Sequence, residues 1–142
     1  MDKLTFNKSE RLCGHSLFTL LFKNGKSFSL SPFRVTWMVS RPSPDFPAPV
    51  RAAFIVPKRN FKKASQRNRI RRRMKEAYRL HKSEFILEQQ AHGNSLIFTC
   101  YYSAREECVF GEIENKIIVT LQRLGREING AQVPPRDSNE NI

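Results

Sequence analysis

The stretch KRNFKKASQRNRIRRRMKEAYRLHK, residues 58–82, holds most of the information about how this chain folds and what it binds. It contains twelve basic residues and one acid, Glu76, and therefore carries +11 of the formal net charge of +12 of the 142-residue chain. Disordered basic tails are normally poor in apolar residues, whereas this stretch has them at helical spacing. It predicts an amphipathic helix over about residues 63–84 that packs one side against the protein. At about 100° per residue, five side chains share an arc of about 100°: Ile70, Met74, Ala77, Tyr78 and His81.

The cations of this predicted helix are mostly arginines. Six arginines and one lysine occur over residues 67–79. Arginine recognises phosphate with two parallel hydrogen bonds and stacks on bases, whereas lysine acts more as a point charge. A solvated charged face is the alternative, but such faces normally mix the two signs of charge. The pattern therefore favours a polyanionic, phosphate-rich partner.

The rest of the chain alternates between helical and extended patterns. Phe33, Val35 and Trp37 alternate with polar residues, as in a strand with one buried face. We expect in chain order a helix at 14–23, strands at 26–30, 32–40 and 50–56, the basic helix, a strand at 95–102 and a helix at 107–128. The order predicts an α+β fold, with a sheet of about four strands packed with three helices. Since the basic helix joins two strands, it is a candidate crossover between parallel neighbours.

Residues 1–129 are expected to form one RNA-binding domain, which agrees with the length of the chain. Residues 41–49 contain repeated prolines and predict a loop, and residues 130–142 are polar and predict a disordered tail.

Several function classes lack support in the sequence. There is no secretory-signal pattern and no run of roughly 20 apolar residues, so a membrane is not expected as a partner. The three cysteines have no metal-ligand spacing and predict reduced thiols in a cytoplasmic protein. The three histidines are scattered, and no phosphate-cradling glycine loop is present. We therefore expect no catalytic residue, metal site, bound cofactor or small-molecule substrate in this chain.

Three motifs resemble the protein component of bacterial ribonuclease P. QRNRIRRRMKEAYRL (66–80) is similar to the family's RNR box, which reads approximately R-N-R-hydrophobic-K-R-x-x-R-E-A-[FY]. VPKRNFKKA (56–64) resembles the V-S-K-K-x-G-x-A-V segment before that box. KSERLCGHSLFTLLFKNGKSF (8–28) follows the pattern of a basic lead-in, a helix with two phenylalanines and a K-x-G stop. The three motifs occur in the family's order, and the resemblance spans about residues 6–126.

The resemblance implies a fold and a function. The fold would be ribosomal protein S5 domain 2-like, with a left-handed βαβ crossover through the RNR helix. The chain would bind ribonuclease P RNA and the 5′ leader of precursor tRNA and promote endonucleolytic removal of the leader. Mg²⁺ held by the RNA would supply the chemistry. The residues implied to contact the RNA are Lys58, Arg59, Lys62, Lys63, Arg67, Asn68, Arg69, Arg71, Arg72 and Lys75, and those implied to line the leader cleft are Phe18, Phe22 and Phe33.

The sequence departs from the family before the RNR box and in the second strand, and residues 41–49 and the tail after Arg126 have no assigned counterpart in the family. The glycine usual between the lysine pair and the RNR box is missing, and Asn60, Phe61 and Lys62 lie there. Thr36 stands where some members have a cleft aromatic residue. Two alternative functions for this chain would use the same basic helix. One is a structural RNA-binding protein of ribosomal type, and the other is a DNA-binding regulator with the helix in a major groove.

Overall fold

The basic stretch forms a helix packed on the rest of the protein, as its spacing predicts. The structure is a computed structural model that describes residues 6, 8–12, 14–40, 48–93 and 95–132. In it, the basic helix is α2 (Ala64–His81). Four side chains of its apolar stripe are fully buried: Ile70, Met74, Ala77 and Tyr78.

Four strands form one mixed sheet. They are β1 (Lys26–Leu30), β2 (Phe33–Ser40), β3 (Val50–Ile55) and β4 (Ser95–Tyr102), in the spatial order β1-β2-β4-β3. Strand β2 pairs antiparallel with β1 and β4, and β3 runs parallel to β4. Since α2 lies between β3 and β4 in the chain, the predicted α+β fold and the crossover between parallel neighbours are confirmed. The handedness of this crossover stays a prediction.

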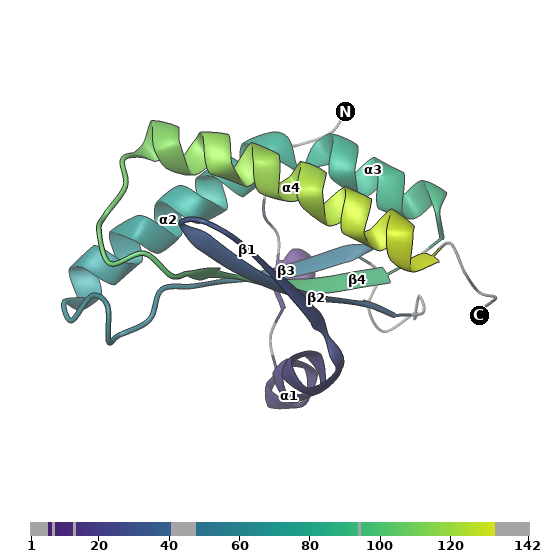
Figure 1. The fold of residues 1–142 in the computed structure, drawn as a ribbon, viewed down its shortest axis with the longest axis horizontal. Coiled ribbons are helices and arrows are strands. Elements are labelled where there is room, and N and C mark those ends of the chain that lie inside the picture. Colours follow the sequence, from purple (N-terminus) through teal and green to yellow (C-terminus); the bar gives the residue numbers. More distant parts are fainter. Residues whose placement is uncertain (1–5, 7, 13, 41–47, 94, 133–142) are drawn as a thin grey trace.

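Helices lie on both sides of the sheet (Figure 1). Helices α2, α3 (Ser83–Ala91) and α4 (Phe110–Gln132) lie above the sheet in this view, and α1 (His15–Asn24) lies below it. A short 3₁₀ helix, η1 (Lys8–Glu10), precedes α1. Helix α1 and the basic helix α2 therefore lie on opposite faces of the sheet.

Two clusters of apolar side chains hold these layers together. The larger core contains the predicted buried face of β2, Phe33, Val35 and Trp37. It also contains a stripe of α4 side chains at helical spacing: Ile113, Ile117, Leu121, Leu124 and Ile128. The smaller cluster joins Leu12 and Leu21 on the α1 side to Ile97 of β4. The alternation of β2 and β4 thus sends successive side chains to different clusters.

Gly25 ends helix α1 and brings β1 close to β2. Its N–H donates to the carbonyl oxygen of Leu21 at 2.7 Å. A Cβ atom at this position would lie 2.5 Å from the Leu21 carbonyl oxygen and 2.9 Å from the Trp37 carbonyl oxygen. Only glycine fits this approach, so Gly25, the glycine of the K-x-G stop predicted in the third motif, ends the helix as expected.

Helix α3 is a fourth α-helix that the sequence pattern does not predict. The basic helix ends at His81 rather than near residue 84, and α3 begins at Ser83. Between them, Lys82 is 5% exposed, pairs with the Glu10 carboxylate and lies over the rings of Phe6 and Tyr78. Lysine is rarely buried unless it is paired, and a partner 72 residues away is invisible to local periodicity.

Helix α4 is shifted toward the C-terminus relative to its prediction. It begins at Phe110 and continues to Gln132, whereas the stripe predicted residues 107–128. Most of the predicted loop at 41–49 lies outside the described residues. The tail predicted at 130–142 starts too early, because residues 130–132 are the last residues of α4, and residues 133–142 lie outside the described residues.

Candidate nucleic-acid interface

The outer side of α2 carries the main group of cations on the protein. Arg69 and Arg72 are exposed, and Arg71, Arg73 and Lys75 are partly exposed, while the apolar stripe of the same helix is buried. Packing against the sheet and α4 therefore fixes which way the cations face.

The loop before α2 holds further cations next to the helix. Phe61 is 4% exposed and packs on the ring of Tyr102 at 5.7 Å between ring centroids. One Arg67 Nη atom donates to the carbonyl oxygens of Phe61 and Lys62, each at 2.9 Å. In the absence of the family's glycine, a buried aromatic ring and the Arg67 guanidinium define this loop. Four cations of the loop stay exposed: Lys58, Arg59, Lys62 and Lys63.

Arg67 and Asn68 thus have structural contacts of their own. The side-chain oxygen of Asn68 accepts a hydrogen bond from an Arg71 Nη atom at 2.7 Å, one turn along the helix. This contact orients the Arg71 guanidinium, while Asn68 itself is exposed.

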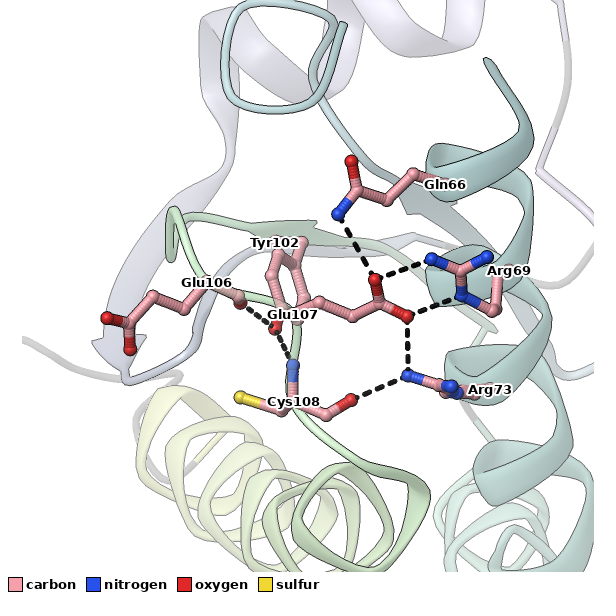
Figure 2. A network of polar contacts seen from close by, with 7 residues as sticks. All are labelled: Gln66, Arg69, Arg73, Tyr102, Glu106, Glu107 and Cys108. Carbon is pink, nitrogen blue, oxygen red and sulfur yellow. Dashed lines mark hydrogen bonds and ion pairs between the residues drawn. The ribbon is translucent and has the colours of Figure 1, made fainter. Parts of the chain in front are cut away.

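A carboxylate from outside the basic segment binds two of its arginines (Figure 2). Glu107 accepts from Arg69 Nε at 2.6 Å and Arg69 Nη2 at 2.8 Å, and also from Arg73 Nη1 at 2.8 Å. Gln66 Nε2 donates to the same carboxylate at 3.1 Å, and Arg73 also donates to the Cys108 carbonyl oxygen. These hydrogen bonds, chiefly that from Arg69, lower the pKa of Glu107 to about 2. Glu107 is therefore ionised at neutral pH and ties α2 to the segment before α4.

The cations of α2 are therefore of two kinds. Arg69 and Arg73 are ion-paired with Glu107, and Arg79 is ion-paired with Glu76 at 2.5 Å. The sequence predicts a helix whose exposed cations are mostly arginines, and the structure shows that three of these arginines are ion-paired within the protein. Arg72, by contrast, is exposed and makes no ion pair with any residue that the structure describes.

Lys75 is more crowded than its exposed neighbours. Partial burial lowers its pKa, and repulsion from Arg11 and Arg71 lowers it further. The Arg11 side chain, which donates to the Phe6 carbonyl oxygen at 3.3 Å, thus adds a cation to the same surface. Sequence reasoning missed Arg11 because 64 residues separate it from Lys75.

The predicted leader residues do not all come together. The rings of Phe18 and Phe22 stack at 6.3 Å with an interplanar angle of 20°. Phe22 is 57% exposed, while Phe18 is half-buried against the cluster of Leu12, Leu21 and Ile97. Phe33 instead points to the larger core, has no exposed surface and contacts Tyr102. We therefore leave Phe33 out of the candidate site.

A polar and aromatic strip on the sheet lies on the α1 side. Arg34 and Tyr101 are register partners on β2 and β4, and strand alternation places them on the same face as Ile97. The Tyr101 hydroxyl accepts a hydrogen bond from Arg59 at 3.3 Å. This contact connects the strip to the basic loop before α2.

Comparison with known proteins identifies the family. A family model described as Ribonuclease P matches residues 6–125. The chain belongs to the ribonuclease P family. Two curated sequences named "Ribonuclease P protein component", from two strains of Porphyromonas gingivalis, are 36% identical over 94 residues and 37% identical over 89 residues. Each match covers 61% of this chain, which spans 64% of the length of these relatives.

Solved structures of ribonuclease P proteins share the fold. The Staphylococcus aureus protein superimposes with a TM-score of 0.56 at 21% identity, covering 89% of this chain and 98% of that one. The Thermotoga maritima protein gives a TM-score of 0.59 at 23% identity, covering 80% of this chain and 96% of that one. The predicted fold class and family resemblance are thus confirmed.

Features of other kinds of site are scarce in the described part of this ribonuclease P family member. Among the described residues, no group of three or more His, Cys, Asp or Glu side chains is placed to hold a metal ion. None of the described helices is both long enough and apolar enough to span a bilayer.

His81 contacts the Glu114 carboxylate at 2.8 Å, which gives it a structural partner on α4. Cys100 is a buried free thiol, and burial raises its pKa.

Proposed function

We propose that this chain is the protein subunit of ribonuclease P and promotes removal of the 5′ leader from precursor tRNA. One observation carries the proposal: the stripe of α2 is buried, while cations of α2 and of the loop directly before it are exposed. A phosphate backbone complements such a surface, and each neutralised phosphate releases counterions. The RNR motif and the family of the chain make ribonuclease P RNA the proposed partner.

Within this surface, the structure supports different roles for different residues. Arg72, Lys62 and Lys63 are exposed and are proposed to contact phosphates directly. Arg67 holds the loop through two backbone carbonyl groups, and its removal would displace the neighbouring lysines. Glu107 binds Arg69 and thereby presents its remaining exposed edge, 47% of the side chain, in a fixed orientation.

The proposed leader site lies on the opposite side of the sheet. Phe22 is an exposed aromatic ring stacked on Phe18, and exposed rings bind unpaired bases by stacking. Arg34 and Tyr101 would continue this site along the sheet toward Arg59. A single-stranded leader could thus pass from α1 toward the surface that docks on the large RNA.

The proposed chemistry belongs to the RNA partner rather than to this chain. Mg²⁺ held by the RNA would activate the attacking water, and the protein would lower repulsion between the two RNA molecules. The proposed location of the complex is the cytoplasm.

Reconstitution tests the proposal. Ribonuclease P RNA and precursor tRNA are mixed at low Mg²⁺ with the parent chain or with the variant Lys62→Ala/Arg72→Ala. We expect the parent to raise the cleavage rate and the double variant to need a higher concentration for the same effect. A matched control, Leu87→Ala, changes an exposed residue of α3 and should behave like the parent. No enhancement by the parent, combined with tight binding to ribosomal RNA, would favour a structural RNA-binding protein of ribosomal type instead.

A further inference from the structure

A hollow in the surface lies between the middle of α2 and the start of α4. It has a volume of about 340 Å³ and is lined by Arg69, Arg72, Arg73, Glu76 and Phe110. This volume is at the lower end of the range of pockets that hold small organic groups, about 300–1,000 Å³. The lining therefore combines cations, one carboxylate and one aromatic ring at a size suited to one compact ligand.

Most of the polar side chains that line the hollow are fixed by ion pairs with other residues of the protein. Arg69 and Arg73 are bound by Glu107, and the Glu76 carboxylate is bound by Arg79. Arg72 is different, because it is exposed and has no ion-pair partner in the described part of the chain. The hollow thus offers one uncommitted guanidinium group within a rigid frame.

The aromatic wall is fixed as well. Phe110 is half-buried, and part of its side chain packs against the larger core. The neighbouring Val109 is 63% exposed, so the chain places an apolar surface beside the arginines. A phosphate group alone would leave the aromatic ring without a binding partner, and an apolar peptide would leave the three guanidinium groups without one. An unstacked nucleotide uses both, since its base packs on rings and guanidinium planes while its phosphate binds a cation.

We propose that this hollow receives one unpaired nucleotide of the RNA partner, with its base against Phe110 and its phosphate on Arg72. This inference rests on the proposed function. It adds a contact with a base of the RNA to a surface that is otherwise proposed to contact only phosphates. Glu76 gives the hollow an acceptor edge. Because the Arg79 hydrogen bond lowers the pKa of Glu76, that edge can only accept hydrogen bonds at neutral pH, which favours bases with N–H donors.

The test uses Phe110→Leu, which keeps an apolar side chain against the core and removes the ring. Loss of a stacked base weakens RNA binding by roughly 5- to 150-fold for a change to alanine, and we expect about tenfold for leucine on ribonuclease P RNA. The slope of log affinity against log salt should stay at the parent value, because no charge is removed. Binding to a fully paired RNA duplex should not change. Val119→Ala changes an exposed apolar residue of α4 outside the hollow and should match the parent on both RNAs.

A second variant distinguishes the loss of a base contact from a loss of folding. Phe110→Trp keeps an aromatic wall and should retain affinity, and its fluorescence should fall when ribonuclease P RNA is added. Trp37 is 3% exposed, so the parent supplies a background for subtraction. Unchanged affinity of Phe110→Leu for ribonuclease P RNA, or an equal loss on the duplex, would overturn the inference. If Arg72→Ala still lowers the salt slope in that case, the proposed function stands; if it does not and cleavage is not enhanced, the proposed function fails too.

Discussion

The substitution Glu107→Gln removes the charge that holds Arg69 and Arg73 together. The carboxylate accepts four hydrogen bonds, two at each oxygen. Glutamine retains one acceptor oxygen, and its NH₂ group would face the guanidinium donors, so we expect two of the four bonds to be lost. A hydrogen bond to a charged group contributes about 1.5–3 kcal/mol, and water replaces part of this because Arg69 is 47% exposed. We therefore predict a loss of about 1–2 kcal/mol in the free energy of unfolding at neutral pH, or roughly 3–7 °C in Tm.

The same carboxylate predicts how this difference depends on pH. Its pKa is about 2 in the folded protein, below the value of about 4.3 expected when the chain is unfolded. A carboxylate with a lowered pKa stabilises the fold above its unfolded pKa, and this contribution is lost as the pH falls toward the folded pKa. The gap between parent and variant should therefore be full at pH 6 and shrink by more than half at pH 3.

Urea denaturation followed by Trp37 fluorescence measures both effects, since Trp37 is the single tryptophan and is buried. Glu106→Gln is the matched control. It makes the same change of charge at an exposed neighbour and should leave stability unchanged. Equal stability of Glu107→Gln and the parent at pH 6, or a gap that persists undiminished at pH 3, would refute the role assigned to this carboxylate.

Further predictions concern single positions on both sides of the sheet. Arg72→Ala should weaken binding to ribonuclease P RNA and reduce the salt slope by about one unit, as measured by titration at several salt concentrations; an unchanged slope would exclude a phosphate contact. Arg67→Ala should in addition lower Tm, because it removes two hydrogen bonds to the loop backbone; thermal denaturation showing a parent-like Tm would contradict that role. Phe22→Ala should reduce affinity for precursor tRNA more than for mature tRNA in the reconstituted complex, whereas equal losses would indicate a packing role. Gly25→Ala should lower the free energy of unfolding by about 1–3 kcal/mol in urea, since the added methyl group meets two carbonyl oxygens; a neutral effect would show that the turn can relax.

The elements with strong periodicity could be predicted from the sequence. The alternation of Phe33, Val35 and Trp37 indicates which face of β2 is buried. The helical spacing of the apolar residues from Ile113 to Ile128 indicates the buried side of α4. Helix α3 has no comparable stripe: among its nine residues only Phe85 and Gln89 are buried, and Gln89 is polar. Local patterning therefore could not separate it from a loop.

The candidate site shows the same division. A net charge concentrated in residues 58–82 predicts a basic surface, but it cannot tell Arg72, which is open, from Arg69, which is neutralised by a residue 38 positions away. Nor can alternation say which face of a sheet meets α1 when helices cover both faces. The family resemblance groups Phe33 with Phe18 and Phe22, whereas the structure places Phe33 with Val35 and Trp37 in the larger core.

Site-directed photo-cross-linking tests the central claim most directly. A photoreactive residue is placed at position 72 on the outer side of α2 or at position 87 on α3, where Leu87 is 60% exposed. Irradiation in the presence of ribonuclease P RNA should cross-link the RNA from position 72 and leave position 87 unreacted. Equal cross-linking from both positions, or from position 87 alone, would contradict the docking of α2 on the RNA.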